Sequence, residues 1–345
     1  PKQLGVILFE KLGLPHGKKT KTGWSTNADV LEKLRYDAPI VADVLRYRQY
    51  AKLKSTYVDG LMKVIEPDGR VRTSFQMTVT ATGRLSSTEP NLQNIPTRTE
   101  LGSQLRRMFT APEGCVLVDA DYSQIELRLL AHIAGDTEMQ AAFRSGEDFH
   151  TVTASRVFHV EPQEVTPEMR RRAKAVNFGI VYGISAFSLA QDIGVSVAEA
   201  KAYMERYFET YQGVRQYMTD VVTQAERDGY VQTLMHRRRA LPELKSSNFN
   251  MREFGKRVAL NMPVQGTAAD IIKLAMVRVH HRLKREGLRA RLLMQVHDEL
   301  IVECPASERE QVERLLTEEM EQAAQLSVPL IAEAHSGKNW LAAKE

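Results

Sequence analysis

Cysteine is scarce in this sequence, which has only Cys115 and Cys304 among its 345 residues. The two lie far apart, and neither has a histidine or another cysteine at metal-ligand spacing. This pattern excludes a disulfide framework and a structural zinc site, and it is typical of a reducing compartment. No apolar run is long enough to cross a bilayer, and no charged-then-apolar leader opens the chain. We therefore expect a soluble, cytoplasmic protein that does not engage a membrane.

The sequence also lacks a strong excess of one charge. Its formal net charge is +4, with 26% charged and 43% hydrophobic residues, which is usual for a soluble globular protein. The basic residues gather in three places: Lys18, Lys19 and Lys21; Arg170, Arg171, Arg172 and Lys174; and Arg237, Arg238 and Arg239. Any one cluster is best explained as a solvated helix face, but three together indicate a polyanionic partner.

Local patterns predict an α+β fold of two or three lobes with a large helical insertion. Expected helices cover 28–35, 39–50, 123–134 and 307–326, with a mostly helical stretch over 148–245 and another helix after Asn261; expected strands cover 71–75, 115–121, 292–296 and 300–303. Thr26 and Pro39 would begin the first two helices. The polar loop from Thr82 to Pro96 has a length that usually binds something or is disordered.

An aspartate ends the strand at 115–121. Side chains alternate across a strand, so Asp119 and Asp121 share a face with Leu117. Asp121 is well placed to hold a metal ion, but a lone aspartate here more often caps a helix, in this case one beginning at Ser123. This position by itself favours the cap.

A second acidic cluster makes a metal-binding role for Asp121 more favourable than a helix cap. The strands 292–296 and 300–303 form a hairpin pattern whose turn is His297-Asp298-Glu299. Hairpin turns usually carry glycine or asparagine, and neither is present here. Two aspartates on neighbouring strand ends make a hard oxygen site suited to Mg²⁺. Such a site holds two ions about 3.5–4 Å apart for phosphoryl transfer, in a nuclease or in a polymerase.

The segment from Thr166 to Lys174 helps to decide between a nuclease and a polymerase. Thr166 is a candidate N-cap, Pro167 a suitable first helical residue, and Glu168 a favourable neighbour of the positive helix end. The cations of 170–174 oppose the helix dipole, so a bound anion would relieve their field.

A stripe along this helix is first cationic and then aromatic. Its members, spaced four residues apart, are Arg170, Lys174, Phe178 and Tyr182. A single nucleotide would fit this stripe, with its triphosphate at the cationic end and its base at the aromatic end. The aromatic residues alone are better explained as part of the hydrophobic core of an amphipathic helix. Gly179 and Gly183 weaken that explanation, because glycine inside a helix costs about 1 kcal/mol and suggests close approach by a neighbour.

Together these stretches resemble the family A DNA polymerases. The motifs are Asp121–Arg128 (DYSQIELR), Arg170–Gly183 (RRRAKAVNFGIVYG), Val296–Leu300 (VHDEL), Thr82–Ser87 (TGRLSS) and Asn91–Pro96 (NLQNIP). The similarity covers essentially the whole chain in the family's order. It implies a right-hand polymerase fold with an antiparallel-sheet palm, helical fingers and a partial helical thumb. The implied segments are 1–63 for the partial thumb, 64–147 and 248–345 for the palm, and 148–247 for the fingers.

The resemblance also implies the roles of the site residues. Asp121 and Asp298 would bind two Mg²⁺ ions, which Mn²⁺ can replace, with the Tyr122 carbonyl helping and Glu299 secondary. The incoming deoxynucleoside triphosphate would be held by Arg170, Lys174, His150, Phe178, Tyr182, Glu126 and Gln124. Within this set Lys174 would stabilise the leaving group, Glu126 would exclude a ribose 2′-hydroxyl, and Tyr182 would guard the template slot. A tyrosine at position 178 would admit dideoxynucleotides.

Primer-template DNA is the implied macromolecular partner, and a monomer is expected. Its contacts would be Arg84, Asn94, Gln265, Asn261, His297, Lys52 and Lys54. Because several of these contact phosphates or lie near them, binding should depend strongly on salt.

The sequence departs from the family in two respects. It begins inside the thumb and has no nuclease domains, so we expect neither proofreading nor 5′-nuclease activity from this chain. Asp119 stands where a small or apolar residue is expected; it could tune metal binding, but we favour a solvent-facing position. A two-metal nuclease would not need the stripe of 170–182, and a non-catalytic binding module would not need both Asp121 and Asp298.

Overall fold

The computed structural model describes residues 2–17, 19–21, 23–97 and 99–344, so Lys18 of the first basic cluster lies outside it. The chain divides into two compact units. Unit 1 is Pro1–Ser74 with Thr88–Leu105, and unit 2 is Phe75–Ser87 with Arg106–Glu345. The division falls within the two-stranded sheet of β3 (Ser74–Gln76) and β4 (Ser86–Thr88). The predicted strand at 71–75 therefore begins later, at Ser74.

Unit 1 is mostly helical. Its elements are α1 (Lys2–Gly5), α2 (Ala28–Lys33), α3 (Pro39–Lys52), α4 (Asp59–Met62), α5 (Glu100–Ser103), the π-helical turns Val6–Lys11 and Leu53–Val58, the 3₁₀ turn Leu92–Asn94, and the strand pair β1 (Lys19–Thr20) and β2 (Gly23–Trp24). A small core of Leu8, Phe9, Leu31, Leu34 and Val41 holds the N-terminal part together.

The helix starts in unit 1 follow the sequence with one exception. Pro39 is the first residue of α3, as predicted. The prediction that Thr26 caps α2 is wrong, because the side chain of Asn27 accepts the hydrogen bond from the Val30 amide at 3.1 Å. Thr26 instead receives hydrogen bonds from the Arg48 guanidinium, one of them to its hydroxyl at 3.0 Å.

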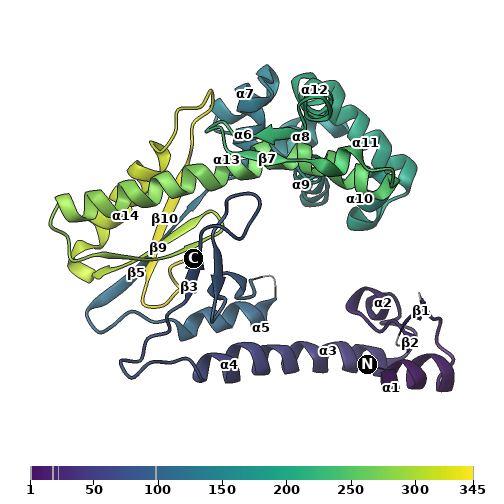
Figure 1. The fold of residues 1–345 in the computed structure, drawn as a ribbon, viewed down its shortest axis with the longest axis horizontal. Coiled ribbons are helices and arrows are strands. Elements are labelled where there is room, and N and C mark those ends of the chain that lie inside the picture. The colour runs from purple at the N-terminus through teal and green to yellow at the C-terminus, as the bar shows by residue number, and fades with distance from the viewer. Residues whose placement is uncertain (1, 18, 22, 98, 345) are drawn as a thin grey trace. The chain divides into compact units, whose positions relative to one another are not determined.

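Unit 2 is built around a four-stranded antiparallel sheet (Figure 1). Its strands, in spatial order, are β10 (Ala332–Gly337), β5 (Cys115–Tyr122), β9 (Glu299–Pro305) and β8 (Arg291–Val296). Three of these strands were predicted. The fourth, β10, was missed because its sequence AEAHSG has no β-branched or large apolar residue, and β10 lies at the edge of the sheet.

The helices of unit 2 are α6 (Ile125–Ile133), α7 (Thr137–Arg144), α8 (Phe149–Phe158), α9 (Pro167–Val181), α10 (Ala186–Ile193), α11 (Val197–Thr210), α12 (Gln212–Asp228), α13 (Phe249–Arg285) and α14 (Arg309–Glu321). Short 3₁₀ turns occupy Pro162–Glu164, Pro242–Lys245 and Ala306–Glu308, and another, Gln104–Met108, crosses from unit 1. The stretch over 148–245 is mostly helical as predicted, but it also contains the hairpin of β6 (Tyr230–Gln232) and β7 (Arg238–Ala240).

Two helix boundaries differ from the prediction by more than two residues. Helix α13 begins at Phe249, well before Asn261, and continues through Pro263. Buried residues on both sides of Pro263 hold the helix across a residue that normally ends one. Helix α14 ends at Glu321 rather than near 326, and residues 322–326 contain no glycine or proline that would have marked the end.

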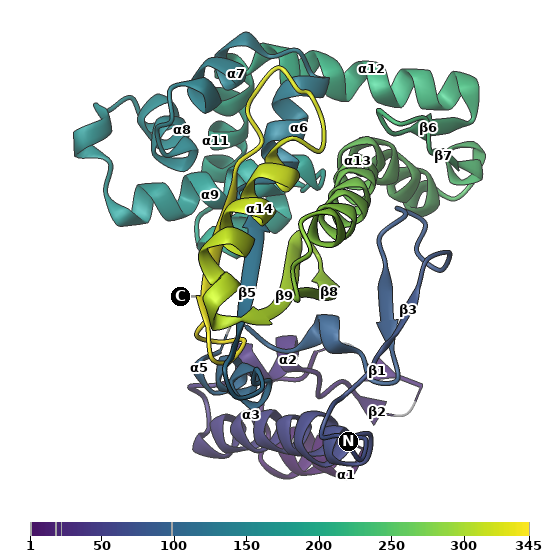
Figure 2. The ribbon, with the colours of Figure 1, turned by 90° about the vertical axis from the view of Figure 1, so that its left-hand side faces the viewer.

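The main core of unit 2 joins the sheet to the helices. Val118 and Ala120 of β5, Leu300 and Val302 of β9, and the inner face of α13 are buried together. Helices α13 and α14 pack against the sheet and against each other (Figure 2). No helix among the described residues is long and apolar enough to cross a membrane. Asp121 and Glu299, at the ends of β5 and β9, therefore lie on strands that are packed into this core.

Candidate active site

The two predicted aspartates come from neighbouring strands. In the antiparallel pairing of β5 with β9, Asp121 lies opposite Glu299, the residue after Asp298. The Tyr122 amide donates a hydrogen bond to the Asp298 carbonyl at 3.1 Å. The strand end and the hairpin turn are therefore held side by side by the backbone itself.

Asp121 does not cap the following helix. Helix α6 begins at Ile125, and the preceding Gln124 has a left-handed conformation with φ of 54° and makes no side-chain cap. The alternative explanation of Asp121 as a helix cap is therefore wrong. Its carboxylate remains 46% exposed.

The hairpin turn contains two residues, not three. His297 takes φ of 52° and Asp298 completes the turn, while Glu299 already belongs to β9. A non-glycine residue at positive φ is uncommon, and it is typical of functional turns. The two acids differ in environment, since the Asp298 side chain is 29% exposed and that of Glu299 only 6%.

Asp119 does not face solvent, so the solvent-facing position that we favoured from the sequence is wrong. The residue is 2% exposed, and the indole N–H of Trp340 donates a hydrogen bond to its Oδ2 at 3.1 Å. Burial raises the pKa of Asp119 to about 6, although Lys344 opposes that shift. Burial likewise raises the pKa of Asp298 to about 6, against the opposing effect of Arg84. Crowded, partly desolvated carboxylates have a strong tendency to attract cations.

Cations of the chain itself already neutralise part of the negative charge of these carboxylates. Among the described residues, no three histidine, cysteine, aspartate or glutamate side chains form a ready metal site. Instead, the Lys344 ammonium contacts Glu299 and lies 3.0 Å from Asp121 Oδ2. Glu299 Oε1 is buried without a hydrogen-bond partner, and Arg106 Nη1 lies 3.6 Å from it. The donor set therefore fits a hard divalent cation.

A hydrogen-bonded network connects the sheet to helix α9. Glu126 is almost fully buried, and its Oε1 accepts from Arg84 Nη2 at 2.7 Å. Its Oε2 accepts from the Tyr182 hydroxyl at 2.6 Å. Arg84 also approaches Asp298 at 3.9 Å. Burial, together with the Glu126 charge, raises the pKa of Tyr182, so the phenol remains a donor.

The N-terminal half of α9 begins as predicted. Thr166 caps the helix by accepting from the Met169 amide at 3.2 Å, and Pro167 is its first residue. Arg170 Nε and Nη2 make hydrogen bonds of 2.9 and 2.7 Å to the two oxygens of Asp148. Burial alone would raise the pKa of Asp148, but hydrogen bonds from Arg170 and Thr151 outweigh it and hold that pKa well below its usual value.

The other cations of α9 differ in whether they form an ion pair. Arg171 and Arg172 both bind Glu168, at 2.7 and 2.9 Å. Lys174 is exposed and has no ion-pair partner within the described part of the chain. Lys174 is therefore the cation of this helix that is most available to an anionic ligand.

His150 lies next to this helix in a buried position. It is 3% exposed, and its Nδ1 is 2.9 Å from Asn177 Nδ2. Burial lowers the pKa of His150 to about 4, so its ring is neutral at pH 7 and can offer a hydrogen bond from Nε2. Its ring centroid is 5.7 Å from that of Phe178.

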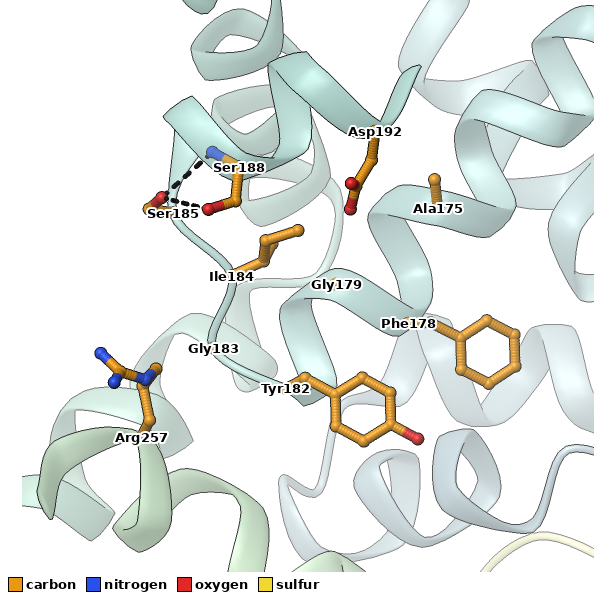
Figure 3. A pocket seen from close by; sticks show the side chains of 10 residues that line it. All are labelled: Ala175, Phe178, Gly179, Tyr182, Gly183, Ile184, Ser185, Ser188, Asp192 and Arg257. Carbon is orange, nitrogen blue, oxygen red and sulfur yellow. Dashed lines mark hydrogen bonds between the residues drawn. The ribbon is translucent and has the colours of Figure 1, made fainter. Parts of the chain in front are cut away.

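The C-terminal half of α9 borders a pocket of about 440 Å³ (Figure 3). Ser185, Ser188 and Arg257 lie on one side of it, and Phe178 and Tyr182 on the other (Figure 3). A Cβ on Gly179 would come within 2.6 Å of the Ile184 side chain. The predicted close approach at this glycine is thus confirmed.

Residues 1–342 match the family model described as DNA polymerase family A. The chain belongs to this family. The resemblance to the family A DNA polymerases is thereby confirmed over essentially the whole chain.

Curated relatives in this family are closely similar. The chain is 58% identical to DNA polymerase I of Bacillus caldotenax over 347 residues and 57% identical to that of Bacillus subtilis over 346. These matches cover 100% of this chain, but only 40% and 39% of the two relatives. The chain thus spans about two fifths of the length of these relatives.

A solved structure shows the same fold. It is described as the POL domain of Pol1 from M. smegmatis in complex with DNA primer-template and dNTP. The TM-score is 0.94 at 50% sequence identity, and the match covers 100% of this chain and 61% of that one. The predicted α+β polymerase-domain fold is therefore confirmed.

The residues expected to contact DNA are divided between the two units. In unit 2, Asn261 and Gln265 lie on α13, with Asn261 Nδ2 3.4 Å from the Tyr182 carbonyl, and His297 is exposed. In unit 1, the Asn94 carbonyl accepts from the Tyr57 hydroxyl at 2.6 Å. Also in that unit, Lys52 is exposed and Lys54 pairs with Asp59 at 2.6 Å.

Three charged residues of this family A site were missed by sequence reasoning. Asp148 binds Arg170, Arg106 approaches Glu299, and Lys344 contacts the acidic cluster. Asp148 could have been found as a helix N-cap, since it accepts from the Thr151 amide at 2.7 Å. No local signal points to Arg106 or Lys344, because their partners are far away in sequence.

Proposed function

We propose that this chain is a template-directed DNA polymerase that adds deoxynucleoside triphosphates to a primer 3′-hydroxyl by two-metal-ion nucleotidyl transfer. One observation supports this proposal over the alternatives of a nuclease and a binding module. In a family A chain, the acidic ends of β5 and β9 lie in the same compact unit as the cationic and aromatic face of α9. A nuclease needs only the first of these features, and a binding module has no need for the acids.

Asp121, Asp298, the Tyr122 carbonyl and, secondarily, Glu299 would hold two Mg²⁺ ions, for which Mn²⁺ can substitute. Bound there, the two ions would lower the pKa of the primer hydroxyl and stabilise the charge that leaves with pyrophosphate. The backbone hydrogen bond from Tyr122 to Asp298 supports this role, because it keeps the ligands in place before substrate arrives. Catalysis would otherwise rest on positioning and charge stabilisation.

The residues of α9 would hold the incoming nucleotide. Lys174, whose exposed ammonium has no ion-pair partner among the described residues, would bind the triphosphate together with Arg170. The neutral ring of His150 would donate a hydrogen bond beside them. Phe178 would pack on the sugar and base. Glu126, with Gln124 preceding it on the same motif, would exclude a ribose 2′-hydroxyl, a role supported by the near-complete burial of its carboxylate.

Tyr182 would guard the template. The pocket beside α9 supports this role, since Tyr182 lines it together with the aromatic ring of Phe178, on which a base could stack. The hydroxyl of Tyr182 is held by Glu126, so any movement of α9 that closes on a nascent pair must break or re-form this bond. Such a step would supply induced-fit selection of the correct nucleotide.

Residues of each unit would contact primer-template DNA. Arg84, Gln265 and His297 would probe the minor groove near the primer end, with Asn261 and Asn94 close by, while Lys52 and Lys54 would hold duplex phosphates. Residues 1–63 would then serve as partial thumb, 148–247 as fingers, and 64–147 with 248–345 as palm. We further propose that this chain polymerises without proofreading or 5′-nuclease activity.

Extension of a labelled primer on a mixed-sequence template, with Mg²⁺ and four deoxynucleotides at low salt, tests the proposal. We expect extension dictated by the template, and its loss in Asp121→Ala. Glu310→Ala is a suitable control, because it removes a carboxylate that is 81% exposed on α14. Shortening of the primer in place of extension would favour the nuclease, and tight DNA binding with no reaction in parent or variants would favour the binding module.

Arg170→Ala is expected to raise the KM for deoxynucleotide by roughly tenfold or more and to change kcat less. A charge-assisted bidentate contact to a phosphate is worth about 1.5–3 kcal/mol, and it forms only if the guanidinium is released by Asp148. Steady-state kinetics with one varied nucleotide would measure this change. Arg171→Ala is the matched control, since Arg171 is one residue away and binds Glu168; equal effects in both variants would contradict the assignment.

A further inference from the structure

The side chain of Lys344 lies among three carboxylates of the sheet. Its ammonium contacts Glu299 Oε2, lies 3.0 Å from Asp121 Oδ2 and 3.8 Å from Asp119 Oδ1. Asp119 and Glu299 are almost completely buried, whereas Asp121 is about half exposed. Lys344 therefore neutralises the same acids that are proposed to bind metal, from the side of a pocket of about 150 Å³.

The backbone that carries Lys344 is firmly anchored. Trp340 is 1% exposed, its amide donates to the Phe109 carbonyl at 2.9 Å, and its indole donates to Asp119. The Arg106 guanidinium stacks on the Trp340 ring at 4.1 Å. Ala343 is fully buried, and the Lys344 amide donates to the Leu341 carbonyl at 3.0 Å. This turn keeps the lysine within reach of the cluster.

The two carboxylates in contact with Lys344 differ in their burial and in the other cations beside them. Glu299 is buried and also has Arg106 at 3.6 Å, so it retains a cation when Lys344 moves away. Asp121 is about half exposed, and among the described residues its ion pair is with Lys344. A lysine ammonium has three donors on a flexible four-carbon chain, so it can release one carboxylate and keep another.

We propose that Lys344 is a displaceable counter-ion of the metal site. It balances Asp121 and Glu299 while no divalent ion is bound, and it releases Asp121 when one binds. The inference depends on the proposed function only in taking Asp121 as a metal ligand. Lys344 is thus a positioning residue that sets how strongly the cluster binds a divalent ion.

The test is the affinity of the chain for Mn²⁺ alone, without DNA or nucleotide, measured by electron paramagnetic resonance of the free ion. Lys344→Met removes the competing charge, so we expect it to bind Mn²⁺ about two- to fivefold more tightly than the parent, the range for a single partly exposed ion pair. Lys338→Met is the matched control, because Lys338 is an exposed lysine six residues earlier, and we expect it to bind as the parent does.

A second readout is thermal unfolding. In EDTA, Lys344→Met should have a lower Tm than the parent, because it leaves Asp121 and Glu299 facing each other without their shared cation. Added Mg²⁺ should raise its Tm more than it raises that of the parent or of Lys338→Met. Folded Lys344→Met protein that binds Mn²⁺ with parental or weaker affinity would overturn the inference.

Asp121→Asn separates this result from a failure of the proposed function. Mn²⁺ binding that is weakened by Asp121→Asn but unchanged by Lys344→Met would overturn only the role of Lys344. Mn²⁺ binding that is unaffected by Asp121→Asn would overturn the metal assignment and the Lys344 inference together. Primer extension by the parent protein tests the polymerase activity independently of both outcomes.

Discussion

Asp298→Asn is expected to reduce template-directed primer extension by about a thousandfold, while binding of primer-template DNA is retained. The substitution removes one negative charge and leaves the shape of the side chain nearly unchanged. The backbone carbonyl of residue 298 still accepts from the Tyr122 amide, so the hairpin should keep its place beside β5. The loss would then reflect the missing charge at the proposed metal site rather than a change in fold.

The expected result is specific to the acidic strand ends. Extension should be followed on a labelled primer, with DNA binding measured in parallel by anisotropy. Glu310→Gln removes a charge of the same kind at an exposed position and should extend at the parental rate. Metal-dependent binding of a deoxynucleotide should also weaken in Asp298→Asn. A variant that keeps more than about a tenth of the parental rate would show that Asp298 does not ligate the metal.

Phe178→Tyr is expected to improve incorporation of dideoxynucleotides by about ten- to a hundredfold relative to deoxynucleotides. Phe178 lies one helical turn after Lys174, with its ring near His150. By resemblance to the family, a hydroxyl added to this ring would take the place of the missing 3′-hydroxyl beside the phosphates. One hydrogen bond to a charged group has the free energy needed for that change.

Chain termination at matched nucleotide ratios measures this effect. The parent should discriminate strongly against the terminator, and Phe178→Tyr should terminate at most template positions. Phe187→Tyr is the control, because Phe187 is 60% exposed and belongs to α10 rather than to the cationic and aromatic face of α9. Equal termination by Phe178→Tyr and the parent would refute the placement of this ring against the sugar.

Much of the local structure could be predicted from the sequence alone. Thr166 and Pro167 mark the start of α9, Pro39 marks the start of α3, and the strands on both sides of His297-Asp298 form the expected hairpin. These signals act over three or four residues, where capping, proline geometry and side-chain alternation are sufficient. The family and the fold class could be recognised for the same reason, since their motifs are short and contiguous.

Local rules failed where several signals competed or none was present. Asn27 rather than Thr26 caps α2, since adjacent residues can both cap and only the path of the chain selects one. Strand β10 is formed by small and polar residues that acquire strand geometry only by pairing with β5. Pro263 lies within a continuous helix because the core on both sides of it outweighs the local preference for an end.

The sequence by itself determined the family, the fold class, the start of α9 and the identity of the acids proposed to bind metal. Only the tertiary structure decided that Asp119 is buried against Trp340, that Asp148 holds Arg170, and that Lys344 lies beside Asp121. The physical reason is the range of each interaction. Caps, turns and strand alternation depend on neighbours in the chain, whereas the charge balance of the site depends on residues that are brought together only when the sheet and its helices pack.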